Sequence, residues 1–367
     1  MKRQASLDIF RGVTLAAMLL VNNPGSWSHV YAPFMHAKWH GLTPTDLIFP
    51  FFMFIVGAAM FYSMAAYAVI SSSTSPRNIP WLKIIKRTAL LFLIGFLLNI
   101  FPFDGAMNEW RIMGVLQRIA LCYGVAAVLV CVCNIRQLVL CCVGLLLGYW
   151  ALLNIVTVPY GLSSNLVRII DLQVFGESHL YHGFGVAFDP EGLLSCIPAV
   201  VTVLAGYLTS AFLAQSKTAK SQYRSLLLYG IIALVLGGLW HVLMPINKAL
   251  WTSSYVLVTS GFAWLVLAII IYLYELKQHH SWFKWAQVYG SNPLFVYVIA
   301  WIFSSCLSLV SWTDSAGNEQ NLQSFIYQSL SSFMPEKLAS LCFALLFVLV
   351  FYGVSHVLYK RKIFIKL

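Results

Sequence analysis

Ten long apolar segments recur along the chain and alternate with shorter polar stretches. Most approach the roughly 20 residues that an α-helix needs to cross the hydrocarbon of a bilayer. They cover residues 7–23, 45–70, 82–100, 112–133, 137–158, 191–213, 223–243, 253–275, 288–310 and 337–359. The polar stretches are loop-sized, and the longest lie near 159–190 and 312–336. The pattern predicts an all-α fold, a polytopic integral membrane helical bundle of about ten transmembrane helices, with a single domain over residues 1–367.

Composition and charge support the membrane interpretation. The chain is 60% apolar and 10% charged, whereas a soluble domain carries roughly 25% charged residues. The net charge of +11 suggests nucleic acid, but its distribution argues against that partner. If the N-terminus is cytoplasmic, 17 of the 23 Lys and Arg fall on the inner side and 10 of the 12 Asp and Glu fall on the outer side. This bias follows the positive-inside rule, so we expect cytoplasmic termini, a lipid bilayer as partner and no nucleic acid.

The first apolar segment follows a basic start, which is also typical of a signal peptide. No A-x-A-like cleavage site follows it, because the chain continues N-N-P-G-S-W. We therefore expect a retained first helix, in which Asp8 and Arg11 are spaced to pair on one face.

A polar cluster stands just before the second apolar segment, in H-A-K-W-H-G-L-T-P-T-D at 36–46. The imidazole of His36 suits a general base or a nucleophile at neutral pH; the alternative is an interfacial histidine bonded to a backbone carbonyl. Thr43 is expected to cap a helix that has proline at its first position and Asp46 in its first turn. Capping is compatible with a second role for Asp46, orienting His36 or His40. No third ligand accompanies the two histidines, so no metal is expected.

Gln117 and Arg118 lie inside an apolar helix, where ionisable groups are costly and usually face a cavity or a partner. Arg118 is either half of a structural ion pair, with Asp46 or Glu109, or a group that holds an anionic ligand. The sequence leaves both roles open.

D-P-E-G at 189–192 has the form of a helix start, with Asp189 as the cap and Glu191 in the first turn. Two carboxylates at a membrane mouth are also candidates for receiving a cationic substrate. Lys248 precedes another capped helix, where it either snorkels to the interface or helps a helix N-terminus to bind an anion such as phosphate.

Three asparagines end or begin apolar segments. Asn22 and Asn23 end the first segment, so they either cap it or line an outer cavity. Asn292, in G-S-N-P-L, opens its segment from the inner side, where it caps a started or kinked helix or marks the inner limit of a site.

Most of these polar residues fall near the predicted outer ends of different segments. Unrelated structural features would scatter over both faces, so the convergence predicts a polar site between helices that opens outward. The residues concerned are Asn22, His36, Asp46, Arg118, Asp189 and Lys248.

Seven strings in the chain resemble the heparan-alpha-glucosaminide N-acetyltransferase family, which includes the bacterial NagX-type proteins. They occur in order over nearly the whole chain. The strings are S-L-D-I-F-R-G at 6–12, N-N-P-G at 22–25, H-A-K-W-H-G-L-T-P-T-D-L-I-F-P at 36–50, G-V-L-Q-R-I-A at 114–120, D-P-E-G-L-L-S at 189–195, N-K-A-L-W-T-S-S-Y at 247–255 and G-S-N-P-L at 290–294.

The resemblance implies a transmembrane acyltransferase that uses acetyl-CoA from the cytosolic side and acetylates an amino sugar on the other side. The histidine of the H-A-x-W motif, His36 here, looks like the catalytic one, and we expect Asp46 to orient it. Gln117, Arg118 and Lys248 are expected at the acyl donor. The acceptor sugar is expected at Asn22, Asn23, His40, Asp189, Glu191 and Asn292.

Two departures from the family pattern affect this expectation. His40 stands where the animal enzymes have asparagine, and we expect the protein to do without the extra lumenal domain of the animal enzyme. We therefore expect a small glucosamine-containing sugar or a cell-envelope glycan as acceptor, in a bacterial inner membrane. The other hypotheses are an N-acetylglucosamine transporter, with His36 and Asp46 handling a coupled proton, and a structural membrane protein. A homodimer is compatible with all of them.

Overall fold

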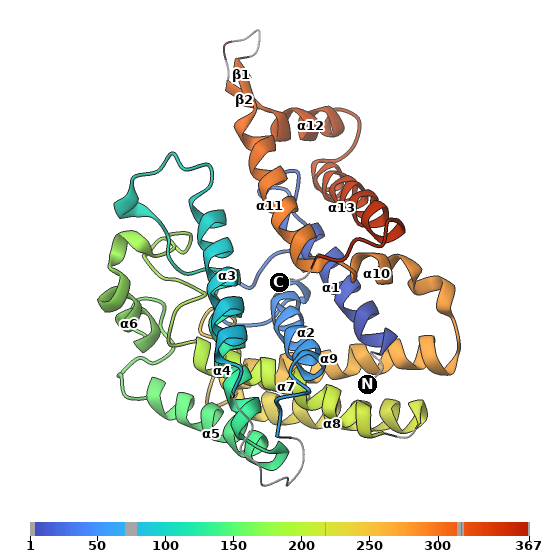
Figure 1. Ribbon diagram of the computed structural model, residues 1–367. Coiled ribbons are helices and arrows are strands. Elements are labelled where there is room, and N and C mark those ends of the chain that lie inside the picture. Colours follow the sequence, from blue (N-terminus) through green and yellow to red (C-terminus); the bar gives the residue numbers. More distant parts are fainter. Residues whose placement is uncertain (1–3, 70–78, 217, 314–316, 318, 366–367) are drawn as a thin grey trace.

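The computed structural model describes residues 4–69, 79–216, 218–313, 317 and 319–365. Its helices are α1 (Ala5–Asn22), α2 (Ile48–Ser63), α3 (Trp81–Ile100), α4 (Val115–Val132), α5 (Ile135–Leu153), α6 (Leu166–Phe175), α7 (Cys196–Gln215), α8 (Ala219–Trp240), α9 (Ser253–Ile271), α10 (Lys284–Tyr289), α11 (Pro293–Leu309), α12 (Leu322–Ser331) and α13 (Glu336–Lys360). Two short antiparallel strands, β1 (Ser311–Thr313) and β2 (Glu319–Asn321), project at the end of α11 (Figure 1). The predicted helical membrane bundle is confirmed.

Eight of the described helices are long and apolar enough to cross a bilayer. Residues 280–289 and 293–309 together are also long and apolar enough, but they are bent by 64° at the break between them, as in a broken span or a re-entrant loop. The span expected at 288–310 corresponds to α11, which follows this break. The segment expected at 82–100 forms α3, which is not among these eight helices and carries three basic residues within its first two turns. Sidedness stays a prediction, and five of the inner basic residues lie outside the described residues: Lys2, Arg3, Arg77, Lys217 and Lys366.

Helix α1 lies in the middle of the bundle, where it contacts α2, α9, α10, α11 and α13 (Figure 1). The expected pair forms on it, with Arg11 Nη1 lying 2.8 Å from Asp8 Oδ1. Arg11 Nη1 also donates to the carbonyl of Gly290, at 3.3 Å. The start of α1 is thereby attached to the break before α11.

Helices α2 and α7 pack backbone against backbone. A Cβ on Gly57 would lie 1.7 Å from the carbonyl oxygen of Val203, and one on Gly206 would lie 1.8 Å from that of Phe54. Ser210 Oγ donates to the carbonyl of Ala58 at 3.0 Å. Small residues and interhelical hydrogen bonds of this kind drive association in a bilayer, where hydrophobic burial gains little.

Gly57→Ala is therefore expected to destabilise the protein by about 1–3 kcal/mol, because the added methyl group overfills the α2–α7 contact. Gly238→Ala on α8 is the matched control, because nothing lies within 4 Å of its added Cβ. Thermal unfolding in detergent measures both. Equal midpoints for the two variants would contradict the close contact.

Candidate active site

The loop between α1 and α2 folds back so that His36 meets Asp46. Thr43 caps the short 3-10 helix Pro44–Leu47 that leads into α2, and Asp46 completes the capping box. Asp46 Oδ2 accepts hydrogen bonds from the backbone N of Thr43 at 3.0 Å and of Ala37 at 3.1 Å. The other oxygen, Oδ1, lies 2.7 Å from His36 Nδ1. The expected double role of Asp46 is present, because one oxygen caps the helix and the other orients His36.

The contact with Asp46 selects one form of the His36 ring. A carboxylate accepts hydrogen bonds, so Nδ1 carries the proton and Nε2 keeps its lone pair when the ring is neutral. The Asp46 side chain is 1% exposed, whereas that of His36 is 48% exposed. A buried carboxylate therefore holds an accessible imidazole whose Nε2 does not contact Asp46, as a general base or nucleophile requires.

Lys248 comes to the same place from the loop between α8 and α9. Its Nζ lies 3.1 Å from His36 Nδ1, 3.2 Å from His36 Nε2 and 3.6 Å from Asp46 Oδ1. Burial lowers the pKa of Lys248, and the charges of Asp46 and Glu191 oppose that effect. A carboxylate, an imidazole and an amine therefore lie within a few ångströms of one another. We call these three residues, Asp46, His36 and Lys248, the His36 cluster.

A second ionic group lies beside it, centred on Arg111. The guanidinium donates to both carboxylate oxygens of Asp189, each at 2.8 Å, and to Glu191 Oε2 at 2.6 Å. It also lies over the ring of Tyr181, 4.8 Å from the centroid. Burial disfavours the Arg111 cation, but the two carboxylates outweigh that penalty and raise its pKa above the usual value. Asp189 and Glu191, expected to receive a cationic substrate, are held by this internal cation.

The expected helix start at D-P-E-G is wrong, because α7 begins at Cys196. Asp189 Oδ1 instead accepts from the backbone N of Glu191 at 2.9 Å, which closes a turn. The physical reason is the bidentate ion pair with Arg111, a stronger interaction than a helix cap. The turn is kept in place by that pair rather than by a helix.

Arg118 is completely buried and has no carboxylate partner among the described residues. Its Nη2 donates to the hydroxyl of Ser195 and to the carbonyl of Gly192, and the guanidinium lies 4.9 Å from the ring centroid of Trp251. Its Nε and Nη1 have no hydrogen-bond partner within the described part of the chain. The ion pair with Asp46 or Glu109 that the sequence allowed is not formed. Two free donors on a buried cation favour the other role, holding an anionic or carbonyl group.

Gln117 and Arg118 point to different neighbours, although they are adjacent. Gln117 Nε2 donates to the carbonyl of Ile112 at 3.0 Å. Its Oε1 faces α3, where it would meet a Cβ on Gly95 at 2.4 Å. Gln117 therefore bonds to the turn before α4, while its Oε1 packs against α3 without a hydrogen-bond partner among the described residues. The structure does not bring it to the Arg118 guanidinium.

The other expected residues divide between the two ends of the bundle. Asn22 and Asn23 line a cavity of about 290 Å³ together with Trp27 and Trp301. The side-chain amide of Asn23 also donates a hydrogen bond to the carbonyl of Leu19 at 2.8 Å. The side chain of Asn22 is exposed and has no hydrogen-bond partner in the described structure. Both expected roles, capping and lining, are therefore present at the end of α1.

His40 joins two loops rather than the His36 cluster. Its Nδ1 lies 3.3 Å from the amide nitrogen of Asn247, which also donates to the carbonyl of Trp39 at 2.9 Å. The backbone N of Gly41 donates to the carbonyl of Ile246 at 2.9 Å. These bonds hold the His36 loop against the loop that carries Lys248.

Asn292 lies far from the other expected residues. Its side chain binds the backbone of Ile363 and Ile365, at 2.9 and 2.7 Å, and does not cap α11. Neighbouring Gly290 packs on Asp8 at the start of α1. Asp8 and Asn22 are separated along α1 by about 21 Å at 1.5 Å per residue.

Several residues of these groups were not singled out in the sequence. Tyr255 donates its hydroxyl to the carbonyl of Asp46 at 2.6 Å, and Arg111, Ser195 and Trp251 make the contacts described above. Three of them stand inside quoted family strings, and Arg111 precedes another by three positions. The family strings were therefore the part of the sequence that could have pointed to these four residues. No pattern in the sequence pointed to Asp171.

Asp171, on α6, fastens the D-P-E-G turn from the other side. It is fully buried, and its Oδ1 accepts from the backbone N of Leu193 at 2.9 Å, while its Oδ2 has no hydrogen-bond partner among the described residues. Burial raises the pKa of Asp171 to about 7, and the charge of Asp189 adds to that rise. The folded protein therefore holds a proton on Asp171 that the unfolded chain releases near pH 4.

This linkage predicts a fall in stability as pH rises. Between about pH 4 and pH 7 the folded state binds one more proton at Asp171 than the unfolded state, so its contribution decreases until pH passes the folded pKa. Asp171→Asn, which keeps the acceptor for Leu193 and cannot ionise, is expected to flatten this part of the profile. Unfolding midpoints of both proteins measured from pH 5 to pH 8 test this; parallel profiles would contradict it.

Comparison with known proteins agrees with the resemblance seen in the sequence. The family model described as "Heparan-alpha-glucosaminide N-acetyltransferase, catalytic" matches residues 3–238. Two relatives carry the name heparan-alpha-glucosaminide N-acetyltransferase: one from Homo sapiens, 28% identical over 425 residues, and one from Mus musculus, 27% identical over 423. Each alignment covers 100% of this chain and 60% of the relative, so the chain spans about three fifths of their length. Since the family model matches well over half of the chain, the protein belongs to the heparan-alpha-glucosaminide N-acetyltransferase family.

Proposed function

We propose that the protein is a transmembrane N-acetyltransferase that moves the acetyl group of cytosolic acetyl-CoA to a glucosamine-type amino sugar on the outer face. The observation that carries this proposal is the His36 cluster, in which a buried carboxylate orients an accessible imidazole beside an amine whose charge burial disfavours. The printed names of the two relatives supply the substrate class. The predicted positive-inside topology supplies the sidedness.

His36 is proposed as the group that handles the proton of the reacting amine. In direct transfer, the sugar amine forms a bond to the acetyl carbonyl carbon, the carbon–sulfur bond breaks, and CoA leaves as the thiolate. His36 Nε2 takes the proton from the amine, and Asp46 stabilises the imidazolium that results. In the alternative, Nε2 attacks the acetyl carbonyl carbon, the carbon–sulfur bond breaks and CoA leaves as the thiolate. The sugar amine then attacks the acetyl-imidazole, the bond from carbon to Nε2 breaks, and the released Nε2 takes the proton of the amine.

The acyl donor is proposed to bind at the two cations of the site, Lys248 and Arg118. An acetyl-CoA molecule brings carbonyl oxygens and phosphates, and a carbonyl gains negative charge as the amine adds to it. Lys248 lies beside His36 and is proposed to stabilise that charge. Arg118 offers two donors, Nε and Nη1, without partners in the described structure. Lys248 and Arg118 lie close enough for the Arg118 charge to contribute to the lowered pKa of Lys248.

The acceptor sugar is proposed to bind at the cavity lined by Asn22. The lining combines indole rings, a free amide and the serines at positions 304, 305 and 308 of α11, a mixture suited to sugar faces and hydroxyls. Asp189 and Glu191 are proposed to act indirectly, by keeping the turn beside Arg118 in place.

The test uses purified protein with acetyl-labelled CoA and glucosamine. Labelled N-acetylglucosamine is the expected product, and N-acetylglucosamine offered as the acceptor is the control because its amine is blocked. Liposomes with acetyl-CoA on one side and glucosamine on the other test the sidedness. Absence of acetyl transfer, together with uptake of labelled sugar into liposomes without acetyl-CoA, would instead establish the transport hypothesis.

A further inference from the structure

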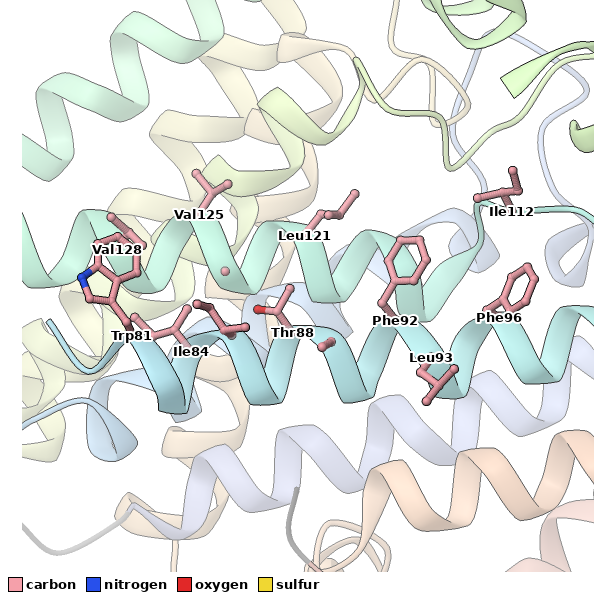
Figure 2. A pocket seen from close by; sticks show the side chains of 13 residues that line it. Trp81, Ile84, Thr88, Phe92, Leu93, Phe96, Ile112, Leu121, Val125 and Val128 are labelled. Atoms are coloured by element: carbon pink, nitrogen blue, oxygen red, sulfur yellow. The ribbon is translucent and has the colours of Figure 1, made fainter. Parts of the chain in front are cut away.

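An apolar groove of about 820 Å³ lies between α3 and α4, away from the His36 cluster. Figure 2 shows Trp81 at one end, Phe96 and Ile112 at the other, and Thr88, Leu121 and Val125 between them. The 15-residue separation of Trp81 and Phe96 along α3 corresponds to about 22 Å. The length of the groove is therefore comparable to most of the ~30 Å thickness of a hydrocarbon core.

Small residues at the centre create the groove. Gly124 lines it on α4, and a Cβ there would lie 2.9 Å from Thr88 Oγ1. Ala89 lines it on α3. Nearly all of the exposed lining is apolar, and the one hydroxyl, Thr88 Oγ1, is buried without a partner within the described residues. The groove therefore suits a narrow, flexible hydrocarbon chain rather than a polar ligand.

Basic residues gather at the Trp81 end. Lys83, Lys86 and Arg87 occupy the first two turns of α3. The chain contains no Asp or Glu at residues 58–103 or 110–170, which include all of α3, α4 and α5. The positive charge at this end therefore has no acidic counterpart on these helices.

The three cations have no carboxylate partner among the described residues, and Lys86 and Arg87 stand beside the groove rather than in its lining. Lys83 Nζ donates to the carbonyl of Ser63 at 2.7 Å. Arg87 lies 4.5 Å from the ring centroid of Tyr123, and its Nε is buried without a hydrogen-bond partner in the described structure. Lys86 is exposed. An anionic group beside Lys86 and Arg87 would supply the missing partner.

We propose that the groove is a binding site for an anionic phospholipid, with one acyl chain between α3 and α4 and the headgroup phosphate at Lys86 and Arg87. A zwitterionic lipid fills the same apolar space but brings a cation to the basic end. A second copy of the chain docked here about a two-fold axis would bring like charges together. The site is independent of the proposed acetyl transfer.

The experiment measures lipid bound to the purified full-length protein by native mass spectrometry, with phosphatidylglycerol and phosphatidylcholine added at equal concentration. Val125→Trp blocks the groove, and its matched control is Val143→Trp on α5, because the two valines are 51% and 50% exposed. Lys86→Gln removes a headgroup contact, and Lys220→Gln at the start of α8 is its control. Phosphatidylglycerol binding is expected to weaken about fivefold with Lys86→Gln, to be lost with Val125→Trp, and to persist in both controls.

Three outcomes would overturn the proposal. Equal retention of both lipids in the wild type would remove the headgroup preference. Unchanged phosphatidylglycerol binding in Val125→Trp would place the lipid elsewhere. A change of Val125→Trp from dimer to monomer, with no change in bound lipid, would show that a second copy covers the groove.

Discussion

Replacing His36 by glutamine is expected to lower the rate of acetyl transfer by about 10²- to 10⁴-fold, the range that proton transfer by a positioned side chain supplies. Glutamine keeps a donor that can reach Asp46 but has no basic nitrogen. His40→Gln is the matched control, since His40 contacts Asn247 rather than Asp46. Initial rates with labelled acetyl-CoA and glucosamine measure both.

The control decides how the loss is interpreted. We expect His40→Gln to remain within a few-fold of wild type, and both variants to unfold at similar temperatures. A His36→Gln protein that keeps more than about a tenth of the wild-type rate would exclude His36 as the base or nucleophile. Labelling of wild-type protein by acetyl-CoA in the absence of sugar would favour the acetyl-histidine route over direct transfer.

Arg111→Gln is expected to destabilise the fold by about 3 kcal/mol, because it leaves the buried carboxylates of Asp189 and Glu191 without their cation. Arg168→Gln is the matched control. Arg168 donates to the carbonyls of Ala187 and Ser163, so its loss leaves no buried charge unpaired. Unfolding in detergent at neutral pH measures both variants.

A double variant separates the unpaired charge from lost packing. Arg111→Gln combined with Asp189→Asn is expected to recover part of the stability, since one carboxylate is then neutral. If the double variant were as unstable as the sum of the single changes, the guanidinium would act through its contact with Tyr181 instead.

How far the sequence could predict the site depended on the distance between partners along the chain. His36 and Asp46 are ten residues apart, and a capping signal predicted the short helix that contains Asp46. Local rules therefore limited the partner of Asp46 to His36 or His40, although they did not choose between the two. Arg111 and Asp189 are 78 residues apart. Their pairing depends on how two loops meet, and no local pattern encodes that.

The same contrast explains the wrong helix start. T-P-T-D and D-P-E-G look alike, but only T-P-T-D begins a helix. In D-P-E-G the carboxylate of Asp189 forms an ion pair with Arg111 instead of capping a helix. The long apolar helices were predicted, since a chain in hydrocarbon must satisfy its backbone within each segment. The helices α6 and α12 were missed because they lie in stretches expected to be loops, and α2 ends at Ser63 rather than near residue 70. The contacts of Asn292 could not be predicted either. Its partners, Ile363 and Ile365, lie after the last helix in a segment whose sequence has no recognisable motif.

The glycine contacts between α2 and α7 restrict how the protein can move. Asp46 stands just before α2, and the turn bonded to Arg118 stands just before α7. With Gly57 and Gly206 against opposing carbonyl oxygens, these two helices cannot slide or rock past each other without breaking that contact. We therefore expect Asp46 and the turn bonded to Arg118 to keep a constant separation. In the proposed transfer, the acetyl group and its carrier would then have to reach a stationary centre.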